Sequence, residues 1–225
     1  MKTSVVLLLL ILPVAFLQTT KSTYICPKLF AGPFSRNASD KNNHTSSMCL
    51  GMIKHWNLGD RDRARSVCIG MGGSLTIPAN EEEFKMFARL ASKMNSTAIA
   101  IDGEISGHCK AKIFGEDGFE VYKDKGECNV KRNLFTFDDY NTDPAWVLEN
   151  MDPHIPSSRG YSGEETFKAK GSFEMIWANL CLVMHPANYT LSGKFNVVNC
   201  RGDKHGNNSD FDVEWAFCGI PVAGK

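Results

Sequence analysis

The chain has 225 residues, and its 25 lysines and arginines are balanced by 25 aspartates and glutamates. A chain of this length with 43% hydrophobic residues can bury the core of one large domain or two small ones. Because the formal net charge is zero, the composition gives no electrostatic reason to expect nucleic acid or an anionic membrane surface as a partner.

Residues 1–22 have the pattern of a secretory signal peptide. Lys2 supplies the positive start, residues 5–17 form an apolar run, and small residues follow it. The alternative is a membrane anchor, which needs about 18 or more consecutive apolar residues. This run is shorter, and Pro13 interrupts it. We therefore predict a soluble protein that is secreted to the extracellular space and has no membrane span.

Cysteines and Asn-x-Ser/Thr sequons agree with that compartment. The eight cysteines can all pair where the surroundings are oxidising, although eight cysteines allow 105 connectivities and spacing alone does not choose among them. The sequons predict N-linked glycans on the surface of a glycoprotein. They begin at Asn37, Asn43, Asn95, Asn188 and Asn207.

Residues 23–50 are polar and irregular, with Pro27 and Pro33 and no sustained hydrophobic period. We predict an N-terminal extension that is clipped by Cys26 and Cys49. The alternative is a disordered tail, and only the two cysteines argue against it.

A first helix is predicted after Trp56, with Asp60 as its N-cap. Apolar residues recur at the i, i+3, i+4 and i+7 spacing that places them on one helix face. They are Ala64, Val67, Cys68 and Met71. The glycines at 72 and 73 can adopt the left-handed conformation that ends a helix. A cysteine on the buried face, in a chain with a leader, indicates one half of a disulfide.

A short strand and a second helix follow. Residues 74–77 alternate polar and apolar, as a half-buried strand does, and Pro78 closes the strand. Asn80 with Glu83 three residues later predicts a helix start of the capping-box type. The buried face of this helix is predicted to carry Phe84, Phe87, Ala88, Ala91 and Met94.

The order of these features resembles the N-terminal half of the C-type lectin-like domain: a tryptophan, an A-x-x-x-C helix, a G-G-x-L strand and an acidic start to a second helix. Next come a β-prone run at 97–101, a D-G pair at 102–103 that predicts a turn, two cysteines around a variable insert, and F-T-F-D at 135–138. This order resembles the secreted C-type lectin-like proteins that are abundant in nematodes.

The resemblance covers residues 51–222, leaving 223–225 as a tail, and implies an α+β, C-type lectin-like fold. Two helices would pack on small antiparallel sheets, with disulfide bonds and a long irregular loop. Further strands are predicted within 134–137, 179–184, 193–200 and 215–221. The resemblance also implies three disulfides. They pair Cys68 with Cys218, Cys109 with Cys128, and Cys181 with Cys200.

Residues 138–179 show no helical or strand period for most of their length, and acidic residues, including Asp138 and Asp139, outnumber basic ones. A structureless segment of this length in a compact domain is usually functional, and the resemblance places the ligand site in it. Its aromatic residues suit sugar stacking or a protein interface, but the tryptophans can instead pack the loop base onto the core. The aromatic residues are Trp146, Tyr161, Phe167, Phe173 and Trp177.

Sugar binding in this family runs through a calcium ion, which takes 6 to 8 oxygen ligands. The family's loop triplet has its nearest match at Asp152-Pro153-His154, where an imidazole suits calcium poorly. Its Trp-Asn-Asp triplet aligns with F-N-V at 195–197, so Asn196 is kept and a valine replaces the aspartate. We predict degenerate ligand-binding positions at Asp152, Pro153, His154 and Asn196, with no metal or cofactor in the usual place.

The predicted function is recognition rather than catalysis. No nucleophile and base pattern is visible, no histidine pair has a zinc-binding spacing, and every cysteine is assigned to a disulfide. We expect a secreted protein, not an enzyme, that binds a glycan or an extracellular protein through the long loop. The alternatives are a calcium-dependent carbohydrate-binding lectin with a displaced site and a non-binding extracellular scaffold. A role in innate immunity is implied by the resemblance alone.

Overall fold

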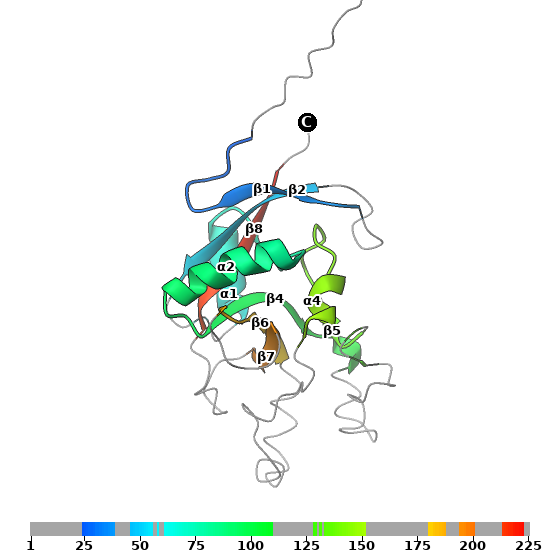
Figure 1. The fold of residues 1–225 in the computed structure, drawn as a ribbon. Helices are drawn as coiled ribbons and strands as arrows, with labels where there is room; N and C mark the ends of the chain where they lie inside the picture. The colour runs from blue at the N-terminus through cyan, green and yellow to red at the C-terminus, as the bar shows by residue number, and fades with distance from the viewer. Residues whose placement is uncertain are drawn as a thin grey trace, which may run out of the picture.

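The computed structural model describes residues 24–38, 46–55, 58, 61–109, 128–129, 131, 133–151, 180–187, 194–200 and 213–222. Within them a sheet lies between two helices (Figure 1). In chain order the elements are β1 (Ala31–Arg36), β2 (Ser46–Lys54), α1 (Arg61–Gly70), β3 (Ser74–Leu75), α2 (Glu81–Lys93), β4 (Ala98–Ile105), β5 (Phe135–Thr136), α4 (Ala145–Glu149), β6 (Leu180–Met184), β7 (Phe195–Asn199) and β8 (Val213–Val222).

The strands of the described residues form one eight-stranded sheet with the order β1-β2-β8-β4-β6-β7, while β3 pairs with β8 and β5 pairs with β4. Strand β8 is antiparallel to β2 and parallel to β4. The predicted α+β fold with two helices and disulfide bonds is confirmed. The sheet, however, is single and mixed rather than a set of small antiparallel sheets, because β4 and β8 meet as parallel neighbours.

The sheet is buried on both faces, with α2 on one face and α1 on the other (Figure 1). On one face Phe87 of α2 packs on Phe217 of β8, with 4.7 Å between ring centroids. On the other face Ala64 and Cys68 of α1 pack against Cys218 of the same strand. Alternate side chains of β8 therefore serve two separate cores, as the two-residue period of a strand requires.

Helix α1 buries Ala64 and Cys68 as predicted, while Val67 and Met71 are partly buried. The predicted N-cap Asp60 lies outside the described residues. The helix ends at Gly70, and Gly72 follows with a φ of 80°. This is the left-handed helix end that the glycine pair predicts.

Helix α2 begins as predicted, because the Oδ1 of Asn80 accepts hydrogen bonds from the backbone N–H groups of Glu82 (3.1 Å) and Glu83 (3.0 Å). Four of the five residues predicted for its buried face are buried. The prediction for Met94 is wrong, since this residue is the C-cap and is 40% exposed. It continues an exposed line of side chains on one flank of α2, with Met86 and Leu90.

The predicted boundary between an N-terminal extension and the domain is also wrong. Strand β2 crosses residue 50 and pairs with β8 from Ser47 opposite Val222 to Lys54 opposite Trp215. Strand β1 adds to β2 at the sheet edge, so residues 31–50 belong to the domain. The predicted signal peptide (1–22) and tail (223–225) lie outside the described residues.

The D-G pair predicted as a turn lies inside β4 instead. Asp102 and Gly103 interrupt the register between β4 and β6, which shifts between Ala100 and Glu104, and Gly103 has a φ of 126°. A turn and a β-bulge both use a glycine with positive φ, so the dipeptide alone does not distinguish them. The bulge directs Asp102 into the interior, where it is fully buried.

The four disulfides of the structure match the expected pairs. Two of them anchor distant parts of the chain: one joins α1 to β8, and one joins the N-terminal segment to β2. The pairs are Cys26 with Cys49, Cys68 with Cys218, Cys109 with Cys128, and Cys181 with Cys200. None of the helices described is long and apolar enough to cross a membrane.

Candidate functional site

A buried carboxylate, that of Asp102, holds the first residues of the long segment that begins at residue 138. Asp102 accepts four hydrogen bonds. Its Oδ1 accepts from the Nη2 of Arg61 at 2.6 Å and from the backbone N–H of Gly103 at 2.9 Å. Its Oδ2 accepts from the backbone N–H groups of Asp138 at 2.7 Å and Asp139 at 2.8 Å. One side chain of β4 thus fixes both the first residue of α1 and the start of the segment.

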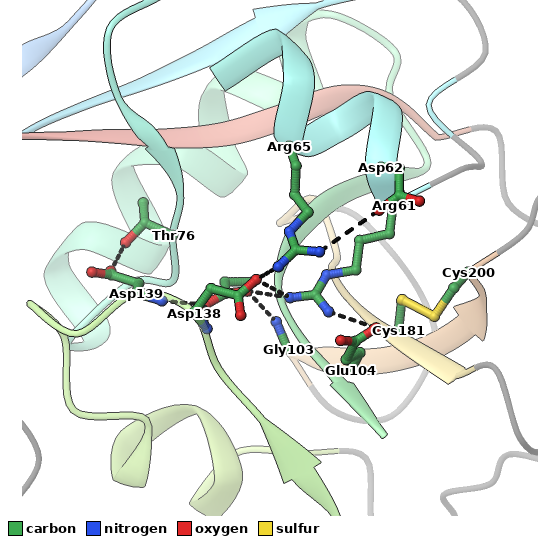
Figure 2. A network of polar contacts seen from close by, with 11 residues as sticks. Arg61, Asp62, Arg65, Thr76, Gly103, Glu104, Asp138, Asp139, Cys181 and Cys200 are labelled. Atoms are coloured by element: carbon green, nitrogen blue, oxygen red, sulfur yellow. Dashed lines mark hydrogen bonds and ion pairs between the residues drawn. A yellow bond between two sulfur atoms is a disulfide. The ribbon is translucent and has the colours of Figure 1, made fainter. Parts of the chain in front are cut away.

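The guanidinium of Arg61 also forms ion pairs with two further carboxylates. Arg61 Nη1 lies 2.9 Å from a carboxylate oxygen of Glu104, and Nη2 lies 3.3 Å from Asp138, which also pairs with Arg65 (Figure 2). The Arg61 side chain is 4% exposed, so its charge depends on these partners for stabilisation.

The charge of Asp102 is set by opposing influences. Burial raises the pKa of the Asp102 carboxyl, while the hydrogen bond from the Asp139 N–H and the charge of Arg61 act to lower it. The net shift is upward. Removing a carboxylate from water is costly, and the four donors around Asp102 offset only part of that cost.

Asp139 extends the buried contacts towards the start of α2. Its Oδ2 accepts hydrogen bonds from the hydroxyls of Thr76 and Thr142, the latter at 2.7 Å, and its Oδ1 accepts from the backbone N–H of Asn141 at 2.8 Å. Asp139 is 2% exposed, so this acidic residue is buried. Its position is fixed by Asp102 of β4 and by Thr76, which lies between β3 and α2.

The final members of this polar network come from β1 and α2. Arg36 donates from Nε to Thr142 Oγ1 at 3.2 Å and forms an ion pair with Glu83. Glu83 in turn accepts a hydrogen bond from the backbone N–H of Ala79 at 2.9 Å. The network therefore connects β1, α1, α2 and β4 to residues 138–142. Together these contacts form a rigid base for the segment that enters the long loop.

The loop base continues into a short helix. Residues 145–149 form α4, so the predicted irregular stretch is ordered at its beginning. The indole of Trp146 contacts the rings of Phe84 and Phe195, with centroid distances of 6.0 and 5.5 Å. For Trp146, the alternative in which a tryptophan packs the loop base onto the core is confirmed. The other four aromatic residues of the loop lie outside the described residues.

The residue before the first predicted triplet lies beside the backbone of β7. Met151 forms an isolated parallel bridge with Phe195, so the residue before Asp152 lies beside the residue before Asn196. The predicted positions Asp152, Pro153 and His154 themselves lie outside the described residues.

Asn196 and Val197 face inward rather than outward. Asn196 is 1% exposed, and its Oδ1 accepts a hydrogen bond from the backbone N–H of Val197 at 2.8 Å, while its Nδ2 has no hydrogen-bond partner among the described residues. Val197 is 3% exposed and packs in the core under α2. The described part of this position thus offers one carboxamide oxygen and no carboxylate, whereas calcium takes 6 to 8 oxygen ligands.

A lysine occupies the neighbouring position. The Nζ of Lys194 pairs with Glu81 at the start of α2 and donates to the Oδ1 of Asn150 at 2.9 Å. It also lies 5.1 Å from the ring centroid of Trp146 and 5.6 Å from that of Phe84, within the range of a cation–π interaction. The ammonium therefore joins β7, α2 and the end of α4, next to the point where the long loop departs.

Replacing Lys194 with methionine should lower the free energy of unfolding by about 1 kcal/mol, from the lost cation–π contacts and ion pair. The hydrogen bond from Lys194 lowers the pKa of Glu81. The part contributed by this ion pair is therefore present above the unfolded pKa of Glu81 and is lost as pH falls through the folded value. Denaturant titrations at pH 7 and pH 3 should show a smaller difference between wild type and variant at the lower pH.

Lys85→Met is the matched control for this prediction. Lys85 also lies near Glu81, at 3.4 Å, but its side chain is 57% exposed, and such surface pairs contribute little. If the Lys85 variant were as unstable as the Lys194 variant, Lys194 would have no special role in stability.

One further cluster has the composition of a metal site but not the chemistry. Ligand atoms of Glu104, Cys181 and Cys200 lie within 4.8 Å of one another. The two sulfurs are bonded to each other (Figure 2), so neither can offer the thiolate that a metal requires.

Two helices on opposite faces of a mixed sheet and four disulfides are the features of a C-type lectin-like recognition domain. Residues 33–221 match the family model of C-type lectin domain-containing protein 141/158. The match spans most of the chain, which therefore belongs to this family. No curated protein sequence matches the chain.

Proposed function

We propose that this protein is a secreted recognition protein that binds a glycan or an extracellular protein through the loop after α4, without a calcium ion in the family's usual position. The proposal includes no catalysis, in keeping with a family whose members are generally not enzymes. The four disulfides of this protein suit an oxidising extracellular environment.

The observation that supports calcium independence most directly is the arrangement at the start of β7. Asn196 and Val197 are turned into the protein, and the ammonium of Lys194 holds Asn150 and Glu81 together beside them. The ammonium of Lys194 thus ties the loop base to the sheet beside Asn196.

A binding experiment with a chelator tests the proposal. Purified protein is applied to a glycan array and to immobilised extracellular proteins, with and without EDTA. We expect the same binding under both conditions, and at least a tenfold loss in a triple variant with Tyr161, Phe167 and Phe173 changed to alanine. The matched control is Tyr140→Ala, because Tyr140 is 72% exposed but precedes α4 in the chain.

The remaining outcomes select the alternatives. Binding that EDTA abolishes would support a calcium-dependent lectin with a displaced site and would contradict the proposal. An absence of binding to any glycan or protein would favour the extracellular scaffold. Equal losses in the loop variant and the Tyr140 variant would remove the loop as the binding element.

A further inference from the structure

One flank of α2 exposes a line of large apolar side chains. Met86, Leu90 and Met94 are 39%, 37% and 40% exposed, and their spacing of four residues places them along one side of the helix. This line is distinct from the buried face of α2, which carries Phe84, Phe87, Ala88 and Ala91.

The apolar flank runs beside an open sheet edge. Glu83, three residues before Met86, pairs with Arg36 at the end of β1. One turn further along α2, Phe87 contacts Phe34 of β1, with 6.4 Å between ring centroids. Among the strands that the structure describes, β1 is the edge of the sheet and pairs on one side with β2. We call β1 together with Met86, Leu90 and Met94 the β1–α2 face; Figure 1 shows β1 and α2 next to each other.

Such a face is a hazard for a protein that must stay in solution. An unpaired strand edge can pair with another chain, and an apolar stripe beside it would strengthen that contact. Within β1 only Arg36 is buried, so the other side chains of this strand are exposed or partly exposed. Pro33 removes one backbone donor but leaves the apolar flank of α2 as it is.

The two described sequons lie at opposite ends of this face. Asn37 directly follows Arg36 and therefore lies at the end of the face where α2 begins. Asn95 directly follows Met94, where α2 has ended. Both asparagines are exposed, and the 13 residues of α2 separate the two ends by about 20 Å. Sugar chains of a few residues attached at both ends would reach across the face.

We propose that Asn37 and Asn95 carry N-linked glycans and that these glycans cover the β1–α2 face, keeping the protein from associating through β1. The proposal rests on the secretion included in the proposed function. In each modification the Nδ2 of the asparagine forms a bond to C1 of an oligosaccharide. The bond from C1 to a lipid pyrophosphate carrier breaks, the carrier leaves with its pyrophosphate, and the amide releases one proton.

The first measurement is occupancy. The full chain is expressed with its own leader in a eukaryotic secretory host, and peptide mapping before and after treatment with a peptide N-glycosidase identifies the modified sites. We expect modification at both Asn37 and Asn95. If the protein does not reach the medium, the secretion part of the proposed function fails. The same mapping is then made with a substituted leader, where an unmodified Asn37 or Asn95 would overturn the glycan proposal alone.

The second measurement is self-association by sedimentation velocity. Removing the glycans enzymatically from the folded protein, or by Asn37→Gln with Asn95→Gln, should raise the association constant about tenfold, the equivalent of about 1.4 kcal/mol. Adding Met86→Lys and Leu90→Lys to the double variant should reverse the increase. Asn207→Gln, at a sequon that follows neither β1 nor α2 in the sequence, should leave the association constant unchanged.

Two outcomes would overturn the covering role. One is a glycan-free protein that stays as monomeric as the modified one. The other is association that persists after the two lysines are introduced, because the contact would then lie on another surface.

Discussion

Replacing both Cys68 and Cys218 with alanine should lower the free energy of unfolding by about 5 kcal/mol. The disulfide between them joins residues 150 apart in the sequence, and a link across so long a loop restricts the unfolded chain strongly. Both cysteines are fully buried between α1 and β8, so the alanines also remove packing. Equilibrium unfolding in guanidinium chloride measures the change.

The disulfide between Cys181 and Cys200 is the matched control. Its residues are 19 apart, and the same dependence on loop length gives about 3 kcal/mol for its removal. The expected free energy of unfolding is therefore highest for wild type, lower for the Cys181/Cys200 variant and lowest for the Cys68/Cys218 variant. If the two double variants were equally stable, restriction of the unfolded chain would not be the main contribution of these bonds.

Replacing Asp102 with asparagine should lower the free energy of unfolding by about 3–5 kcal/mol, the usual cost of breaking a buried ion pair. An amide keeps the shape of the carboxylate but has one oxygen, so donors now face its NH₂ group at one of the two positions. Arg61 also loses the partner that contacts it at 2.6 Å. Thermal and denaturant unfolding measure the loss, and hydrogen exchange at residues 138–142 reports loosening of the loop base.

Asp138→Asn is the control, since the Asp138 side chain is 46% exposed and surface ion pairs contribute about 0–1 kcal/mol.

A second readout for the Asp102 variant is the pH dependence of its stability. Burial raises the pKa of Asp102, so the folded protein binds a proton there more readily than the unfolded chain does. The free energy of unfolding therefore falls as pH rises from the unfolded pKa of Asp102 to its higher folded pKa. The Asp102 variant should lack this slope; a variant within 1 kcal/mol of wild type would contradict the network's role.

Elements with a strong local pattern could be predicted from the sequence. The spacing of apolar residues in α1 and α2, the glycine pair after α1 and the cap at Asn80 all depend on residues within one or two turns. The structure places these features where the sequence predicts them. Met94 is the exception, because the pattern does not show where the helix ends.

Elements determined by distant partners could not be predicted in the same way. Strand β1 has one buried side chain, that of Arg36, whose partners Glu83 and Thr142 are 47 and 106 residues away. No alternation of apolar residues marks such an edge strand, so the segment resembles an irregular extension. The bulge at Asp102 also depends on a distant partner. The Asp-Gly dipeptide by itself indicates a turn, and only its contact with Arg61 shows that Asp102 points into the interior.

The structure describes the backbone beside the candidate ligand positions, where residues 151 and 195 lie side by side. Asp152, Pro153 and His154 lie outside the described residues, so the ligand site stays a prediction. The roles of Lys194 and Asp102 were not foreseen, because a lysine before a strand and an aspartate before a glycine are common on any surface. Their function depends on burial and on partners that sequence spacing does not show.

The central place of β8 has a practical consequence for measurements on this protein. Its last residue, Val222, lies opposite Ser47 near the start of β2, so β8 leaves the sheet at the end where β1 and β2 meet. The elements that flank the long loop, α4, β6 and β7, lie at the opposite end (Figure 1). A fluorescent reporter or a sensor chip joined after β8 would therefore stand away from α4, β6 and β7, and immobilisation through that end leaves these elements facing the analyte.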